Sequence, residues 1–147
     1  TDGKFHLHGW VQSHLHGVSA RFESLCRHEN VVYHGPYQNA DLDTLLAPYR
    51  IGLIPYAVSN HINRYVNPDK IYHYLRAGME VVATPIPQAL RMQEYVHLAD
   101  TAAEFASRIN ALLSGSERKR PAHLGSRFHW SERWPNLKAS IAKLSAR

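Results

Sequence analysis

The sequence has a single cysteine, Cys26, among its 147 residues, and no apolar run approaches the roughly 20 residues that span a bilayer. One cysteine excludes both a disulfide framework and a multi-cysteine zinc site, and it is typical of a reducing compartment. No secretory signal pattern opens the chain, so we expect a cytoplasmic protein. There is also no phosphate-binding Gly-x-Gly-x-x-Gly and no Walker loop, so neither a dinucleotide-binding nor an NTPase function is indicated.

Acidic residues are fewer than basic ones: 12 Asp and Glu stand against 17 Lys and Arg, a formal charge of +5. This excess favours anionic partners such as a nucleotide, a phosphate group or an acidic membrane surface. The basic residues form no stripe interleaved with aromatics, so we do not predict nucleic-acid binding. The run Arg118-Lys119-Arg120 has two interpretations, a contact with acidic lipid head groups or a solvated linker.

Hydrophobic periodicity predicts strands that alternate with helices. This alternation predicts one α/β domain over residues 1–147, a Rossmann-like three-layer α/β/α sandwich with a parallel sheet. The 51–56 strand is apolar on both faces, as expected of a central strand, and Thr101 with Glu104 matches a capping box. Residues 114–130 are expected to link the domain to the last helix. The expected strands are 5–8, 30–34, 51–56, 80–84 and 96–98, and the expected helices are 18–28, 41–49, 69–77, 88–95, 101–113 and 131–145.

Three loops are expected at the carboxyl edge of the sheet, where open α/β folds bind their ligands. One follows Gly9, one spans residues 57–68, and one follows Thr84. The middle loop is longer than most connections of its kind, carries Arg64 and ends at a helix start that includes Lys70. Two interpretations remain open for it: an anion site built from these cations and the free helix N–H groups, or a solvated loop with an ordinary cap.

Histidine is abundant, with eleven residues, including the pairs His6/His8 and His14/His16. Residues two apart on a strand share a face, as chelation requires. No Asp, Glu or Cys nearby completes a ligand set, so we expect scattered surface histidines and predict no metal site. Cys26 lies next to Leu25 on the apolar side of its helix, which indicates a small core residue.

Three segments resemble the nucleotide-sugar-binding half of GT-B glycosyltransferases of the group 1, family-4-like type. Residues 30–56 contain NVVYHGPY, a leucine-rich helix and IGLIPY, as in the middle of that domain. Residues 67–84, NPDKIYHYLRAGMEVVAT, resemble the family pattern P-x-K-x-x-E-Y-L-A-x-G-x-P-V-V-A-T. Residues 128–134, FHWSERW, resemble its C-terminal F-S-W-x-x-R. The resemblance covers nearly the whole chain.

The resemblance implies the C-terminal half of a GT-B fold, which binds a UDP-, GDP- or ADP-sugar and requires no metal or other cofactor. It places the diphosphate near Arg64 or Lys70, and it places the turn after Thr84, with Pro85 and Pro87, close by. It implies that an N-terminal acceptor domain and the first βα unit lie outside this chain. The full set of implied donor-binding residues is Gly9, Arg64, Tyr65, Asn67, Lys70, His73 and Thr84.

The chain departs from the family pattern at positions that matter for the donor. His73 and Tyr65 stand where the family has glutamates, and Glu80 stands where it has proline. An imidazole forms a hydrogen bond with a hydroxyl but lacks the charged, bidentate acceptance of a carboxylate.

Because of these departures, we keep two hypotheses for the function. The first is a donor-binding domain, inactive alone, of a transferase that acts on a polysaccharide or glycolipid at the inner face of the membrane. The second is a degenerate, non-catalytic docking or regulatory module.

Overall fold

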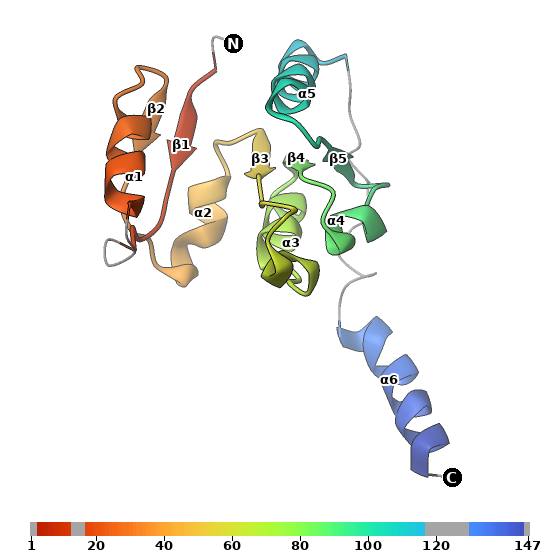
Figure 1. Ribbon diagram of the computed structural model, residues 1–147. Coiled ribbons are helices and arrows are strands. Elements are labelled where there is room, and N and C mark those ends of the chain that lie inside the picture. Colours follow the sequence, from red (N-terminus) through yellow and green to blue (C-terminus); the bar gives the residue numbers. More distant parts are fainter. Residues whose placement is uncertain (1–2, 13–16, 117–129, 146–147) are drawn as a thin grey trace. The chain divides into compact units, whose positions relative to one another are not determined.

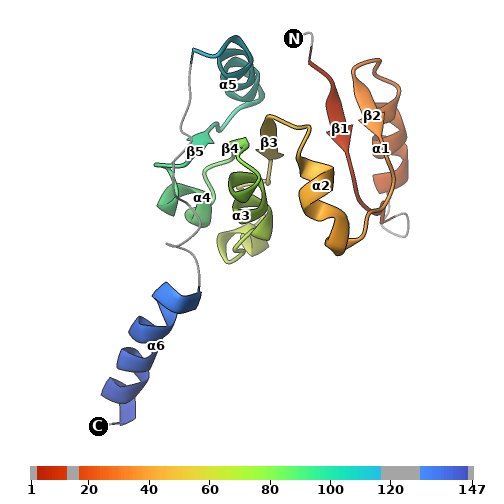
Figure 2. The same ribbon diagram turned by 180° about the vertical axis from the view of Figure 1, so that it is seen from behind.

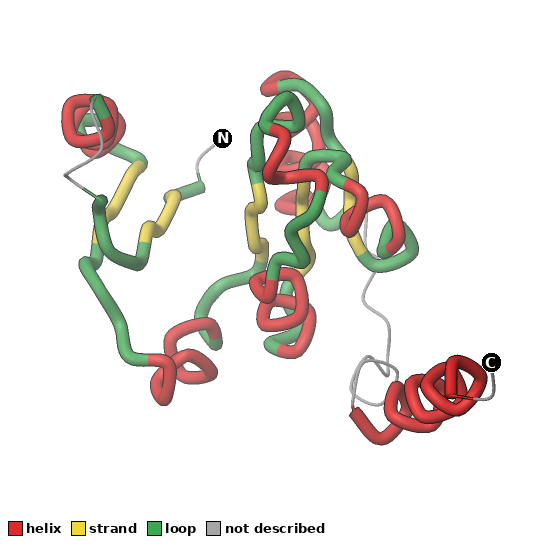
Figure 3. Tube along the Cα trace, turned by 60° about the horizontal axis from the view of Figure 1, so that its bottom comes forward, coloured by secondary structure: helices red, strands yellow, loops and turns green. Residues whose placement is uncertain are grey.

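A computed structural model of the chain describes residues 3–12, 17–116 and 130–145. The chain folds as two compact units, residues 1–48 and residues 49–147. In each unit, parallel strands alternate with helices that pack beside them (Figure 1). The α/β fold class with parallel strands, predicted from the sequence, is therefore confirmed. Hydrogen bonding groups the strands into a two-stranded and a three-stranded sheet (Figure 3).

The first unit is a short βαβ arrangement. Strands β1 (Phe5–Leu7) and β2 (Val31–Tyr33) are parallel, with Leu7 opposite Tyr33. Tyr33 also meets the ring of Phe22 edge to face, at a centroid distance of 4.8 Å, which joins helix α1 to the sheet. In chain order, the first unit consists of β1, α1 (Val18–Cys26), β2, the 3-10 helix η1 (Asn39–Asp41) and α2 (Leu42–Leu46).

The second unit is built on three parallel strands in the order β3-β4-β5. These are β3 (Ile51–Ile54), β4 (Glu80–Ala83) and β5 (Val96–Leu98). All four residues of β4 are buried, because it pairs on both sides and is covered on both faces. The prediction that residues 51–56 form the central strand is thus wrong for this sheet, since β3 is at its edge and β4 is central.

Helices cover both faces of this sheet, so that the strands lie as a middle layer between two layers of helices (Figure 2). On one face, Val81 and Ala83 pack with residues of α3 (Asp69–Arg76) and α4 (Pro87–Arg91). On the other, Val82 packs with residues of α5 (Ala102–Ser114). Alternate residues of a strand point to opposite faces, so the apolar run of β4 supplies both cores.

Several element boundaries differ from the sequence prediction. The helix expected over 41–49 is limited to α2 after a 3-10 turn, and α4 ends at Arg91 because residues 92–95 turn to enter β5. The capping box of Thr101 and Glu104 is confirmed, with both reciprocal bonds present. The last helix, α6, spans Trp130–Ser145. Most of the expected 114–130 linker, including Arg118–Arg120, lies outside the described residues.

Candidate functional site

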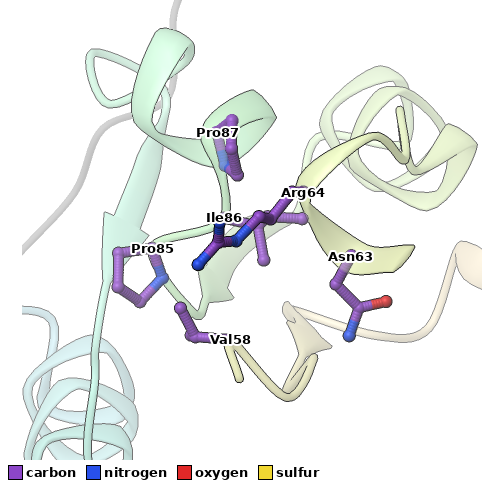
Figure 4. A pocket seen from close by; sticks show the side chains of 6 residues that line it. All are labelled: Val58, Asn63, Arg64, Pro85, Ile86 and Pro87. Atoms are coloured by element: carbon purple, nitrogen blue, oxygen red, sulfur yellow. The ribbon is translucent and has the colours of Figure 1, made fainter. Parts of the chain in front are cut away.

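A hollow of about 220 Å³ lies where β3 and β4 end. The loop after β3 and the turn after β4 line it together (Figure 4). Both segments follow the carboxyl ends of parallel strands, where ligands bind in open α/β sheets. Two of the three predicted loops therefore meet in one place. The six lining residues are Val58, Asn63 and Arg64 from the loop, and Pro85, Ile86 and Pro87 from the turn.

The loop after β3 is shaped by its own side-chain amides. The side-chain oxygen of Asn60 accepts a bond from the backbone N–H of Ile62 (3.0 Å), and the Asn63 amide donates to the carbonyl of Ala57 (2.8 Å). Such local bonds are typical of Asn in turns. They stabilise a short 3-10 helix, η2 (His61–Arg64), at whose end Arg64 lies.

The turn after β4 is fixed to the end of β3. Both the backbone N–H and the hydroxyl of Thr84 approach the carbonyl of Ile54, at 3.1 and 3.4 Å. The N–H of Ile86 then donates to the carbonyl of Thr84 (2.8 Å), and Pro87 opens α4 at a position where a helix needs no N–H. Thr84 thus holds the turn that forms one wall of the hollow.

Arg64 provides the formal charge among the residues that line the hollow. Its side chain extends across Ile86 toward Pro85, while Asn63 points to the other side (Figure 4). A guanidinium carries five N–H donors in a planar fork, which fits the oxygens of phosphate groups. A cation above a largely apolar wall suits a phosphorylated ligand better than a neutral one.

The structure places the predicted binding residues in different ways. Arg64 lines the hollow, and Thr84 is buried directly before the lining turn. Gly9 lies in the other unit, where its carbonyl accepts a bond from the Tyr33 hydroxyl (2.7 Å). The remaining predicted residues do not line the hollow. These are Tyr65, which is 77% exposed, Asn67, Lys70 at the start of α3, and His73, whose ring lies 4.0 Å from the Asp69 carboxylate.

Asn67 takes part in a chain of hydrogen bonds that joins α3 to α4. The hydroxyl of Tyr72 donates to the side-chain oxygen of Asn67 (3.0 Å) and accepts from the amide of Gln88 (2.8 Å). The same amide lies 3.6 Å from the sulfur of Met92. This chain connects the two segments that flank the hollow, so it positions them relative to each other.

Val58, Asn63 and Ile86 also line the hollow, and the sequence did not identify them as binding residues. Ile86 is 1% exposed and forms part of the hydrophobic core as well as the wall of the hollow. The two neighbours of Ile86, Pro85 and Pro87, were expected close to the donor, and they line the hollow with it; because prolines on both sides restrict the backbone, they indicate that Ile86 lies there too.

Three histidines of the first unit gather instead of being scattered. His6 and His8 share one face, and the Nδ1 of His6 lies 2.8 Å from the Nε2 of His34. The rings of His8 and His34 are nearly parallel at 4.4 Å. Burial, followed by the proximity of His34 and His6, lowers the pKa of His8. Within the described ranges, no three His, Cys, Asp or Glu side chains are arranged to hold a metal ion; His14 and His16 lie outside them.

No protein-family model matches the chain, and no solved structure matches it. Among curated proteins, the chain is similar to a protein of Bacillus subtilis (strain 168) whose description, the teichuronic acid biosynthesis glycosyltransferase TuaH, is provisional. The two are 33% identical over 89 residues, which is 60% of this chain. The matched segment is 22% of the length of that relative, so the chain corresponds to about a fifth of it. This similarity supports a relationship between the chain and glycosyltransferases.

Proposed function

We propose that the chain is the nucleotide-sugar-binding domain of a GT-B glycosyltransferase, and that the hollow at the ends of β3 and β4 receives the diphosphate of the donor. The observation that carries the proposal is the position of Arg64 at a hollow formed by two loops at the carboxyl edge of a parallel sheet. The similarity to a glycosyltransferase and the family-like segment 67–84 support the same function.

The size of the hollow suits part of the donor. Pockets that enclose a whole small-molecule ligand measure about 300–1,000 Å³, whereas this one measures about 220 Å³. We therefore propose that the diphosphate binds in the hollow, while the nucleoside and the sugar extend beyond it. Tyr65, which follows Arg64 and is exposed, and Lys70 at the start of α3 then contact the extending parts.

In sugar transfer, negative charge develops on the departing nucleoside diphosphate as the bond from the anomeric carbon breaks. A fixed cation aimed at those oxygens stabilises the charge without reorganisation at the moment of reaction. Arg64 fills this role in our proposal, held in place by the bonds that Asn60 and Asn63 make within its loop. The acceptor, a polysaccharide or glycolipid, and the residues that activate it belong to another domain. The isolated chain is expected to bind donor weakly and to transfer no sugar.

A non-catalytic docking or regulatory module is the second candidate. It is favoured by the position of His73, which stands where the family has a glutamate and lies 4.0 Å from Asp69 on the surface of α3. A domain that has lost the contact to the ribose hydroxyls retains the fold and loses donor affinity. Nucleotide binding therefore distinguishes the two candidates.

Isothermal calorimetry with UDP, GDP and ADP tests the proposal. We expect at least one diphosphate to bind, and the corresponding nucleoside to bind at least about tenfold more weakly, because it lacks the charged group. Arg64→Gln should weaken diphosphate binding by about tenfold or more, while Arg27→Gln in the other unit, a matched loss of one charge, should leave it unchanged. Absence of heat with all three diphosphates would favour the docking module.

A further inference from the structure

The positive charge of the chain is concentrated in its last part. Residues 117–147 contain eight Lys and Arg against two Asp and Glu, a formal charge of +6. Residues 1–116 contain nine against ten, a formal charge of −1. The attraction to anionic partners that the whole composition indicates therefore comes from the segment that includes α6.

Helix α6 also carries an exposed apolar stripe. Spacings of three and four residues place its members on one side of the helix, within an arc of about 80° at 100° per residue. Nothing among the described residues covers this stripe, which a surface helix normally buries. Its members are Trp134 (49% exposed), Leu137 (41%), Ile141 (50%) and Leu144 (72%).

Basic side chains accompany the stripe along the helix. Lys138 and Lys143 are exposed, and the Nζ of Lys138 lies 5.9 Å from the ring centroid of Trp134. A lysine near the border of an apolar stripe extends its ammonium to polar surroundings while its methylenes stay on the apolar side. An indole is likewise suited to the boundary between apolar and polar layers.

We propose that α6 is an interfacial helix that binds the surface of an anionic phospholipid bilayer, with its apolar stripe in the head-group and acyl boundary and its lysines on the lipid phosphates. Apolar and aromatic residues on one side, with lysines among polar residues around them, are the features of helices that lie in a membrane plane. The formal charge of +6 that the sequence carries over residues 117–147 adds the electrostatic attraction that such binding needs. The helix has 16 residues, and no described helix is long and apolar enough to cross a bilayer, in keeping with a position on the surface.

A second copy of the chain fits the stripe less well. In a two-helix pairing, the positions that border the apolar seam face the corresponding positions of the partner. In the sequence, the positions that border the stripe include Lys138 and Arg133, both basic, so pairing of two copies is opposed by like charges. A bilayer that contains anionic lipid neutralises these charges.

Co-sedimentation of the 147-residue chain with vesicles tests this proposal. We use phosphatidylcholine vesicles with and without about 30% phosphatidylglycerol, and expect binding to the anionic vesicles that weakens as salt is raised. Each basic residue near an anionic membrane surface strengthens partitioning onto vesicles about fivefold. Lys138→Glu/Lys143→Glu should therefore weaken the partitioning of the chain at least about tenfold. The matched double charge reversal Lys4→Glu/Arg21→Glu, in the other unit, should change it less than about twofold.

A second variant separates the apolar contribution from the charge. Leu137→Ser/Ile141→Ser keeps every charge and alters exposed positions only, so circular dichroism should show the folded domain while partitioning falls about tenfold or more. The proposal is overturned by equal binding to neutral and anionic vesicles, by no binding to either, or by α6 variants that bind like the parent chain. A concentration-dependent dimer that the Leu137/Ile141 variant abolishes, without any vesicle binding, assigns the stripe to self-association instead.

Discussion

The imidazole of His97 and the carboxylate of Glu80 meet inside the second unit, with Nε2 and Oε2 3.1 Å apart. Both side chains are almost completely buried, Glu80 at the start of β4 and His97 in the middle of β5. A polar pair on neighbouring strands stabilises the sheet only while both members are present, because each partner compensates the cost of burying the other.

Removal of one member of this pair should therefore destabilise the fold strongly. We expect His97→Leu to lower the free energy of unfolding by about 3 kcal/mol, since it leaves the Glu80 carboxylate buried without its imidazole. The double variant Glu80→Met/His97→Leu should lose clearly less than the sum of the two single variants. Urea unfolding of all four proteins measures this coupling, and additive losses would show that the two side chains do not act as a pair.

Gly52 of β3 should not tolerate a side chain. A Cβ at this position would overlap the ring of Tyr74 on α3. We expect Gly52→Ala to cost about 2 kcal/mol in urea unfolding, because excess volume in a packed core forces neighbouring groups to move. Combining it with Tyr74→Leu should recover part of that loss relative to the two single variants. If Gly52→Ala unfolds at the same urea concentration as the parent chain, that result would contradict the close approach of α3 to β3.

The hydroxyl of Tyr72 should matter for both stability and nucleotide binding. Tyr72→Phe removes the bonds to Asn67 and Gln88 but keeps the ring, so we expect a loss of about 1 kcal/mol in unfolding free energy. On the proposed function, diphosphate binding weakens severalfold as well, because the two segments that flank the hollow are no longer held together. Calorimetry measures this effect, and Tyr37→Phe in the other unit serves as the control.

His8 should titrate at a lower pH than an ordinary histidine. Burial and the neighbouring rings of His34 and His6 disfavour its charged form, so its pKa in the folded state lies below that in the unfolded chain, about 6.5. The folded state binds this proton less readily than the unfolded chain does. The stability that neutral His8 contributes is therefore complete above about pH 6.5, and it is lost as the pH falls through the lower folded-state pKa. NMR titration of the histidine ring protons measures the midpoint.

The variant His34→Gln provides the control for this titration. It removes one source of repulsion, so the midpoint of His8 should move upward while part of the lowering, caused by burial, persists. A midpoint of His8 at or above that of a free histidine would contradict the arrangement of the three rings.

The sequence predicted the elements well where the pattern is long or carries a specific local signal. The spacing of Thr101 and Glu104 identified the start of α5, and Val81 and Val82 identified a buried strand. The position of β3 in its sheet was predicted wrongly, because apolar residues on both faces report burial and not strand order. The site was predicted in part: loop length and the strand ends located Arg64, whereas the role of Ile86 in the wall depends on packing.

Contacts between distant residues could not be read from local patterns. His34 joins His6 and His8 only because parallel pairing brings Tyr33 opposite Leu7, and this register is set by the fold. Glu80 and His97 are 17 positions apart and meet for the same reason. In the sequence, Glu80 looks like a departure from a family pattern, and His97 looks like a surface histidine.

NMR mapping of amide shifts during titration with a nucleoside diphosphate tests the proposed diphosphate site. We expect the largest shifts at Val58, Asn63, Arg64 and Ile86, and we expect Arg64→Gln to reduce them, while the amides of α5 remain unchanged. Shifts confined to other parts of the chain, or no shifts at millimolar nucleotide, would contradict a diphosphate site at the ends of β3 and β4.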